Sequence, residues 1–147
     1  MAIVFFHSAD RVLYLPGKKI LKQSVEALFR LEKTPVSSVH YIFCSDEYLL
    51  GINREFLHHD TYTDIITFNL AAGKAPVEGE VYISLDRVHD NARLLAVPYR
   101  QELPRVVFHG ALHLCGYRDK KPADRLLMRK KENLYLKRLE WGLKASK

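Results

Sequence analysis

The sequence predicts an α+β fold, a single domain over residues 1–147 in which a mixed sheet of about four strands packs against helices. Strand-like and helix-like segments are mixed along the chain without strict alternation, which is typical of this class. Hydrophobic residues make up 48% of the 147 residues, which is enough for one well-buried core. No internal repeat and no Gly/Ser-rich linker divides the chain, so we expect one unit.

Four elements are predicted in the first part of the chain. A β-prone run predicts a short strand at Ile3–Phe6, and apolar residues at helical spacing predict a helix over Lys18–Lys33. The β-branched and aromatic run Val39–Cys44 predicts a buried strand. Ser45 is typical of a helix N-cap and predicts a helix directly after it. The predicted buried stripe of that helix is Leu49, Ile52 and Phe56.

Two further strands and a helix are predicted in the middle of the chain. The strands cover Asp64–Leu70 and Gly79–Leu85, and the segment between them contains the turn-forming residues Gly73 and Pro76. Asp86 can cap the helix that follows, because a side-chain carboxylate accepts hydrogen bonds from free N–H groups of a first turn. The apolar side of this helix is predicted to be Val88, Ala92 and Leu95.

Two helices are predicted to complete the chain. The first covers about Gln101–Cys115, with Pro104 tolerated because it lies near the first turn. The second is predicted to begin at Pro122 and to reach Trp141. Its predicted apolar stripe follows seven-residue steps through Leu127, Leu134 and Trp141.

Composition favours a protein of a reducing compartment, and we expect a cytoplasmic location. The chain has 2 cysteines, too few for a disulfide framework. No apolar run is long enough to span a bilayer and no signal-peptide pattern is present at the N-terminus, so no membrane partner is expected. The net charge of +6 permits contact with a polyanion such as RNA, although a basic surface without a special partner explains it about equally well.

The run from His109 to Asp119 predicts a metal site at the C-terminal end of a central helix. His109 and His113 are four residues apart, so on a helix their side chains share one face and can bind one ion. Gly116 can end the helix and turn the chain back, which brings the Asp119 carboxylate towards the same point. Three protein ligands leave one position of a zinc ion open, as catalytic sites require. A bare pair of histidines at this spacing more often marks packing or surface.

Gly110 argues against peptide hydrolysis at this site. The spacing is similar to the His-Glu-x-x-His-x-x-Gly-x-x-His run of metzincin peptidases. Those enzymes carry a glutamate directly after the first histidine as the general base, and this chain has Gly110 there. The metal-binding spacing is therefore retained without the proton-transfer group of a peptidase.

Three blocks of the sequence resemble the YbeY family, bacterial metal-dependent endoribonucleases that act in ribosomal RNA maturation. His109-Gly-x-Leu-His113-Leu-x-Gly116-Tyr117 is similar to the signature of that family. The blocks at residues 63–68 and 79–84 resemble its Thr-Asp-Val-Leu-Ser-Phe and Gly-Asp-Ile-x-Ile-Ser blocks, in the right order. The combination covers the chain from about Ile52 to Asp119 and is far more specific than the histidine motif alone.

The resemblance implies one zinc ion held by His109, His113 and Asp119, with His109 also part of the catalytic site. The family usually has a third histidine where this chain has Asp119. A carboxylate there makes the site one charge more negative and adds affinity for harder cations.

A second departure concerns an arginine implicated in the activity of the family. Leu57 occupies the aligned position, and Arg54 lies about one helical turn earlier. We predict that Arg54 takes the catalytic role, and a surface arginine beside Glu55 is an equally good reading. A basic cluster after the metal-site run can guide an RNA backbone or form an ordinary solvated helix face. Its members are Lys120, Lys121, Arg129, Lys130 and Lys131.

Taken with the resemblance, the sequence predicts a zinc-dependent endoribonuclease specific for single-stranded RNA. The expected role is maturation of the 3′ end of small-subunit ribosomal RNA and ribosome quality control. The expected partners are ribosomal RNA and the small ribosomal subunit, and the sequence leaves the oligomeric state open. Two alternatives stay open: a ribosome-assembly RNA-binding protein with a mainly structural metal, and a metal-dependent hydrolase of another substrate.

Overall fold

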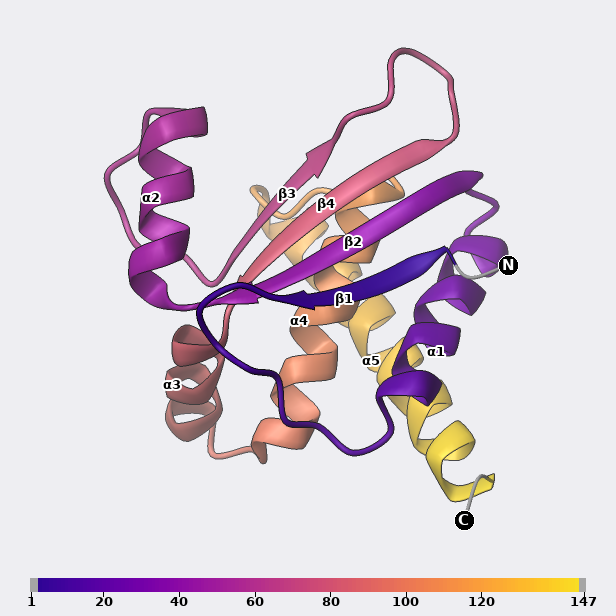
Figure 1. Cartoon of the computed structure of the whole chain (residues 1–147). Coiled ribbons are helices and arrows are strands. Elements are labelled where there is room, and N and C mark those ends of the chain that lie inside the picture. The colour runs from indigo at the N-terminus through magenta and orange to yellow at the C-terminus, as the bar shows by residue number, and fades with distance from the viewer. Residues whose placement is uncertain (1–2, 146–147) are drawn as a thin grey trace.

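A four-stranded mixed sheet forms the centre of the protein in a computed structural model that describes residues 3–145 (Figure 1). The strands lie in the order β1 (Val4–Ser8), β2 (Val36–Cys44), β4 (Val77–Ser84) and β3 (Ile65–Asn69). The first three strands run parallel, and β3 is antiparallel to β4 at one edge. The expected mixed sheet of about four strands is confirmed.

Helices cover the two faces of the sheet unequally. The main core contains side chains of α1 (Lys18–Leu31), α3 (Leu85–Leu95), α4 (Tyr99–Leu114) and α5 (Pro122–Ala145). A second, small cluster holds α2 (Asp46–Leu57) against the opposite face. The alternation of strand side chains explains the division, since Val81 and Ile83 enter the main core while Tyr82 enters the small one.

Helix α4 is buried along most of its length, which places its residues firmly against the sheet. Leu103, Val107 and Leu112 are fully buried in the main core. The hydroxyl of Tyr41 on β2 donates a 2.9 Å hydrogen bond to the carbonyl oxygen of Val107 in the same helix. Figure 1 shows α4 running behind the sheet, between α3 and α5. The predicted central position of the helix that carries His109 and His113 is therefore confirmed.

The predicted buried stripe of α5 is wrong by one residue. Leu127, Leu134 and Trp141 are 44%, 47% and 59% exposed. The buried residues of α5 are instead Met128, Glu132, Tyr135 and Leu139. Steps of three and four residues and steps of seven residues both keep one face of a helix, so the predicted stripe has the right period and is offset by one residue.

Two smaller predictions also need correction. The N-cap of α3 is Ser84, whose hydroxyl accepts a 3.1 Å hydrogen bond from the backbone N–H of Arg87, so Asp86 lies inside the first turn. Because α3 begins directly after β4, the last strand residue also serves as the cap. Leu95 and Phe56 are exposed rather than buried, and each lies in the last turn of its helix. Ser45 is confirmed as the N-cap of α2.

No helix among residues 3–145 combines the length and the apolar character that crossing a bilayer requires.

Gly110 marks a close approach of α4 to the sheet. A Cβ atom added there would lie 2.8 Å from Cγ1 of Val81 and 3.0 Å from Cδ1 of Ile65. The Val81 side chain is stiff at χ1 and completely buried, so it has little freedom to move away. The position that carries a glutamate in metzincins is therefore closed here by packing as well as by residue type.

Replacing Gly110 by alanine is expected to lower the free energy of unfolding by about 1–2 kcal/mol, because overpacking outweighs the better helix propensity of alanine. Urea unfolding measures the change. Gly51 in α2 is the matched control, since a Cβ there meets nothing within 4 Å. Gly51→Ala should leave stability unchanged or raise it by up to about 1 kcal/mol. A Gly110→Ala protein as stable as the parent would contradict the close approach of α4.

Candidate metal centre

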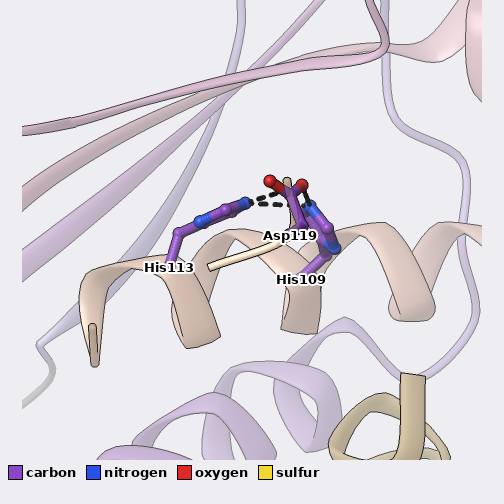
Figure 2. A group of neighbouring side chains, drawn as sticks. All are labelled: His109, His113 and Asp119. Atoms are coloured by element: carbon purple, nitrogen blue, oxygen red, sulfur yellow. Dashed lines mark hydrogen bonds and ion pairs between the residues drawn. The ribbon is translucent and has the colours of Figure 1, made fainter. Parts of the chain in front are cut away.

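Three side chains converge on one point at the C-terminal half of α4 (Figure 2). Nε2 of His109 and Nε2 of His113 are 3.1 Å apart. Oδ2 of Asp119, from the loop after α4, lies 3.2 Å from each of them. The edge of a tetrahedron around a zinc ion is about 3.3–3.4 Å when the metal–ligand distances are about 2.0–2.1 Å. The three donor atoms are therefore spaced as three corners of a zinc site.

The hydrogen bond made by Nδ1 of each imidazole ring determines whether Nε2 of that ring offers a lone pair or a hydrogen to this point. Nδ1 of His113 lies 3.0 Å from the carbonyl oxygen of Tyr117, and Nδ1 of His109 lies 2.7 Å from Oε2 of Glu132. A carbonyl or carboxylate oxygen only accepts hydrogen bonds, so each Nδ1 carries the hydrogen. In the neutral rings both Nε2 atoms then direct lone pairs towards the Asp119 carboxylate. Such a group of acceptors fits a cation at its centre.

Glu132 of α5 belongs to a buried charge network that supports His109. Glu132 and Glu102 are 2% and 1% exposed, and the guanidinium of Arg105 lies between them. Nη1 of Arg105 is 3.0 Å from Oε1 of Glu132. Burial by itself raises the pKa of Glu132, but the hydrogen bond from His109 and the charge of Arg105 outweigh it and hold that pKa below its usual range. Glu132 is therefore an ionised acceptor that orients the His109 ring.

Glu132 was not predicted as a site residue from the sequence. The signal for it is a glutamate on the buried face of α5, which is recognisable once the buried positions of that helix are assigned correctly. Met128, Tyr135 and Leu139 form the apolar face of the helix, and Glu132 lies on that same face. A carboxylate at such a position is buried only with a partner. Its partners, Arg105 and His109, come from another helix, so their proximity depends on the tertiary packing of α4 against α5.

The loop that carries Asp119 is fastened to two other elements. Gly116 has φ +99°, a left-handed conformation suited to glycine, and it turns the chain at the end of α4. The Tyr117 hydroxyl donates a 2.5 Å hydrogen bond to Glu32, at the end of α1. Glu32 also accepts from the Tyr135 hydroxyl and from Nζ of Lys131, 3.2 Å away. One carboxylate thus holds the Tyr117 segment, whose carbonyl oxygen orients His113.

The three donors face a cleft of about 1020 Å³ between α4, β3 and the segment that precedes β3. Leu57, the residue at the aligned position of the family arginine, lines this cleft. His59 and Lys120 line it too and supply groups that can contact phosphate. Asp64, which the sequence analysis did not select, lies in the same cleft and accepts a 3.4 Å hydrogen bond from Asn91.

Arg54 is not among the residues that line the cleft. Its side chain is 58% exposed and its guanidinium pairs with Asp60. Its predicted catalytic role stays a prediction. The basic cluster after the metal loop is also divided, because Lys120 lines the cleft whereas Lys131, which is not among the lining residues, pairs with Glu32.

The fold and the site together define an α+β protein whose central helix presents a candidate three-donor metal centre to an open cleft. The sequence profile described as Endoribonuclease YbeY matches residues 12–140. An Endoribonuclease YbeY from Cytophaga hutchinsonii is 44% identical over 133 residues, which is 90% of this chain and 93% of the relative. Another, from Flavobacterium psychrophilum, is 48% identical over 113 residues, covering 77% of this chain and 80% of the relative.

A solved structure shares the fold over nearly the whole chain. The solution structure of TM1509 from Thermotoga maritima superimposes with a TM-score of 0.65 at 28% identity, covering 98% of this chain and 93% of the other. The chain belongs to the endoribonuclease YbeY family. The resemblance inferred from the three sequence blocks is thereby confirmed.

Proposed function

We propose that this protein is a metal-dependent endoribonuclease that hydrolyses phosphodiester bonds in single-stranded RNA. The proposal rests on membership of the endoribonuclease family and on one observation above all. Three acceptor atoms, from His109, His113 and Asp119, converge at 3.1–3.2 Å in an open cleft. Zinc is the proposed ion, because two imidazoles and a carboxylate form an established type of ligand set for a catalytic zinc.

The proposed chemistry divides between the ion and the side chains around it. A zinc ion bound here would lower the pKa of water and polarise a phosphate oxygen. Glu132 and the Tyr117 carbonyl hold the two imidazole rings in the tautomer that binds metal. Lys120 lies where it can attract the RNA backbone. Position 110 cannot supply a carboxylate base in this scheme, because a side chain there would collide with Val81 and Ile65 of the sheet.

We also propose that the substrate is a ribosomal RNA precursor, matured at the 3′ end of the small-subunit RNA, and that the protein acts on the small ribosomal subunit in the cytoplasm. The motif resemblance supports this assignment, and the net charge of +6 is compatible with an RNA partner. Cleavage of a defined precursor RNA tests it, because a processing enzyme should cut near the mature 3′ end. Uniform cutting along the precursor, or none, would contradict the proposal.

The experiment that tests the enzymatic proposal uses chelator-treated protein and protein reloaded with zinc. Reloaded wild type should cleave a labelled single-stranded RNA and leave the matching duplex intact, whereas chelator-treated protein and the His109→Ala variant should be inactive. Metal content is measured on the same samples. RNA binding with a full metal load and no cleavage would instead assign the protein as an RNA-binding assembly factor with a structural metal.

A further inference from the structure

The edge strand β3 turns half of its backbone hydrogen-bonding groups away from the sheet. The backbone N–H of Ser84 donates to the carbonyl of Asp64 at 3.0 Å, and that of Leu70 donates to the carbonyl of Glu78 at 2.8 Å. In an antiparallel ladder the paired positions repeat every second residue, so Ile66 also exchanges bonds with β4. The alternate residues of β3 therefore direct their N–H and C=O groups outwards. These residues are Ile65, Thr67 and Asn69.

The outward edge of β3 faces the same cleft as the candidate metal ligands. Ile65, Thr67 and Asn69 line the cleft together with His109 and Asp119. Strand β3 is the last in the order β1-β2-β4-β3, so among residues 3–145 no further strand covers this edge. Exposed strand edges are templates for an extended partner. Here the exposed strand edge lines the same cleft as the three donor residues.

We propose that the outward backbone edge of β3, at Ile65, Thr67 and Asn69, binds the single-stranded RNA segment that adjoins the scissile phosphate. The proposal rests on the endoribonuclease function proposed above. The backbone N–H and C=O of Thr67 bind the Watson–Crick edge of an unpaired base, which carries both donors and acceptors. A duplex cannot use this edge, because its Watson–Crick groups are already paired. Single-strand specificity then follows from the backbone of β3.

Geometry and charge both favour RNA on this edge. Outward groups on a strand recur at about 6.4–6.8 Å, every second residue. This repeat is close to the spacing of successive nucleotides in an unstacked single strand. Lys120 and His59 line the cleft and can neutralise phosphate charge. An extended peptide would fit the strand edge as well, but Gly110 leaves the site without the glutamate that zinc peptidases use.

The test removes one outward N–H without touching the ladder to β4. Proline lacks a backbone N–H and is tolerated on an edge strand where that N–H faces away from the sheet. Thr67→Pro should weaken binding of a single-stranded RNA to zinc-free protein by about 3- to 10-fold, the loss expected for one hydrogen bond. Fluorescence anisotropy measures the binding. Thr67→Ala keeps the N–H and measures the contribution of the side chain alone, so the loss of about 3- to 10-fold in Thr67→Pro is expected relative to Thr67→Ala.

Amide NMR on the wild-type protein provides a second measurement that needs no variant. Single-stranded RNA should shift the Thr67 amide resonance and slow its hydrogen exchange, whereas the Ile66 amide, which already bonds to β4, should change little. Wild-type affinity in a folded Thr67→Pro protein, or a Thr67 amide unaffected by saturating RNA, would overturn the proposal. Protection by an extended peptide and not by RNA would do the same and assign the edge to a peptide. RNA cleavage with an unaffected amide refutes only the role of β3, while absence of cleavage refutes the function.

Discussion

Replacing His113 by alanine is expected to weaken zinc binding by more than about 100-fold and to abolish RNA cleavage. The variant loses one of three donors and leaves only Nε2 of His109 and the carboxylate of Asp119 at the centre. Loss of an outer supporting group costs about 10–100-fold in affinity, so loss of a direct ligand should cost more. Competition with a chromophoric chelator gives the zinc affinity, and a labelled single-stranded RNA gives the cleavage rate.

His89→Ala is the matched control for His113→Ala. His89 is an exposed histidine of α3 whose ring stacks on Tyr99, and it lies outside the candidate ligand group. Its removal should leave both zinc affinity and cleavage unchanged. If His113→Ala bound zinc as tightly as the wild type, the assignment of this histidine as a ligand would be wrong. The folded state of both variants is checked by circular dichroism.

The second large effect is expected at Glu132, although its side chain does not point at the metal position. Glu132→Ala removes the acceptor that fixes the His109 ring and leaves Arg105 with one buried carboxylate partner in place of two. Breaking a buried ion pair costs about 3–5 kcal/mol of stability. Loss of the hydrogen bond to the imidazole should weaken zinc binding by about 10–100-fold. Thermal unfolding and chelator competition measure the two losses separately.

Glu132→Gln separates the orienting role from the charge. Glutamine retains an oxygen that accepts from Nδ1 of His109, so most of the zinc affinity should survive while the ion pair with Arg105 is lost. Glu140→Ala, at an exposed position of the same helix, is the control and should change neither quantity by much. Equal zinc affinity in wild type, Glu132→Ala and Glu132→Gln would refute the positioning role.

Local spacing explains why the candidate ligands were predictable. His109 and His113 share a helix face through a four-residue step, and Gly116 turns the chain so that Asp119 meets them. All three lie within one short run of sequence, so no long-range packing had to be known. The order of strands and helices was likewise readable, since each element carries its own periodicity.

Features that depend on contacts between distant elements were not readable. Glu132 is buried because Arg105 and His109, on another helix, neutralise and bind it. The stripe of α5 was misplaced because a leucine pattern at seven-residue steps looked apolar, whereas the face that packs includes a carboxylate. The role of Arg54 was predicted only because it lies about one helical turn before Leu57. In the structure its guanidinium pairs with Asp60.

The contacts of the Glu32 carboxylate join an early part of the chain to late parts, so a newly made chain cannot form all of them until its last helix has been synthesised. Glu32 ends α1, which leaves the ribosome early, and it binds Tyr117 and Tyr135 near the other end of the chain. A nascent chain that stops before α5 contains both histidines and Asp119, but neither Tyr135 nor Glu132. Its imidazoles therefore lack the full set of supports. The supports of His109 and of the Tyr117 segment are complete only when the last helix has been synthesised and has packed against the other helices.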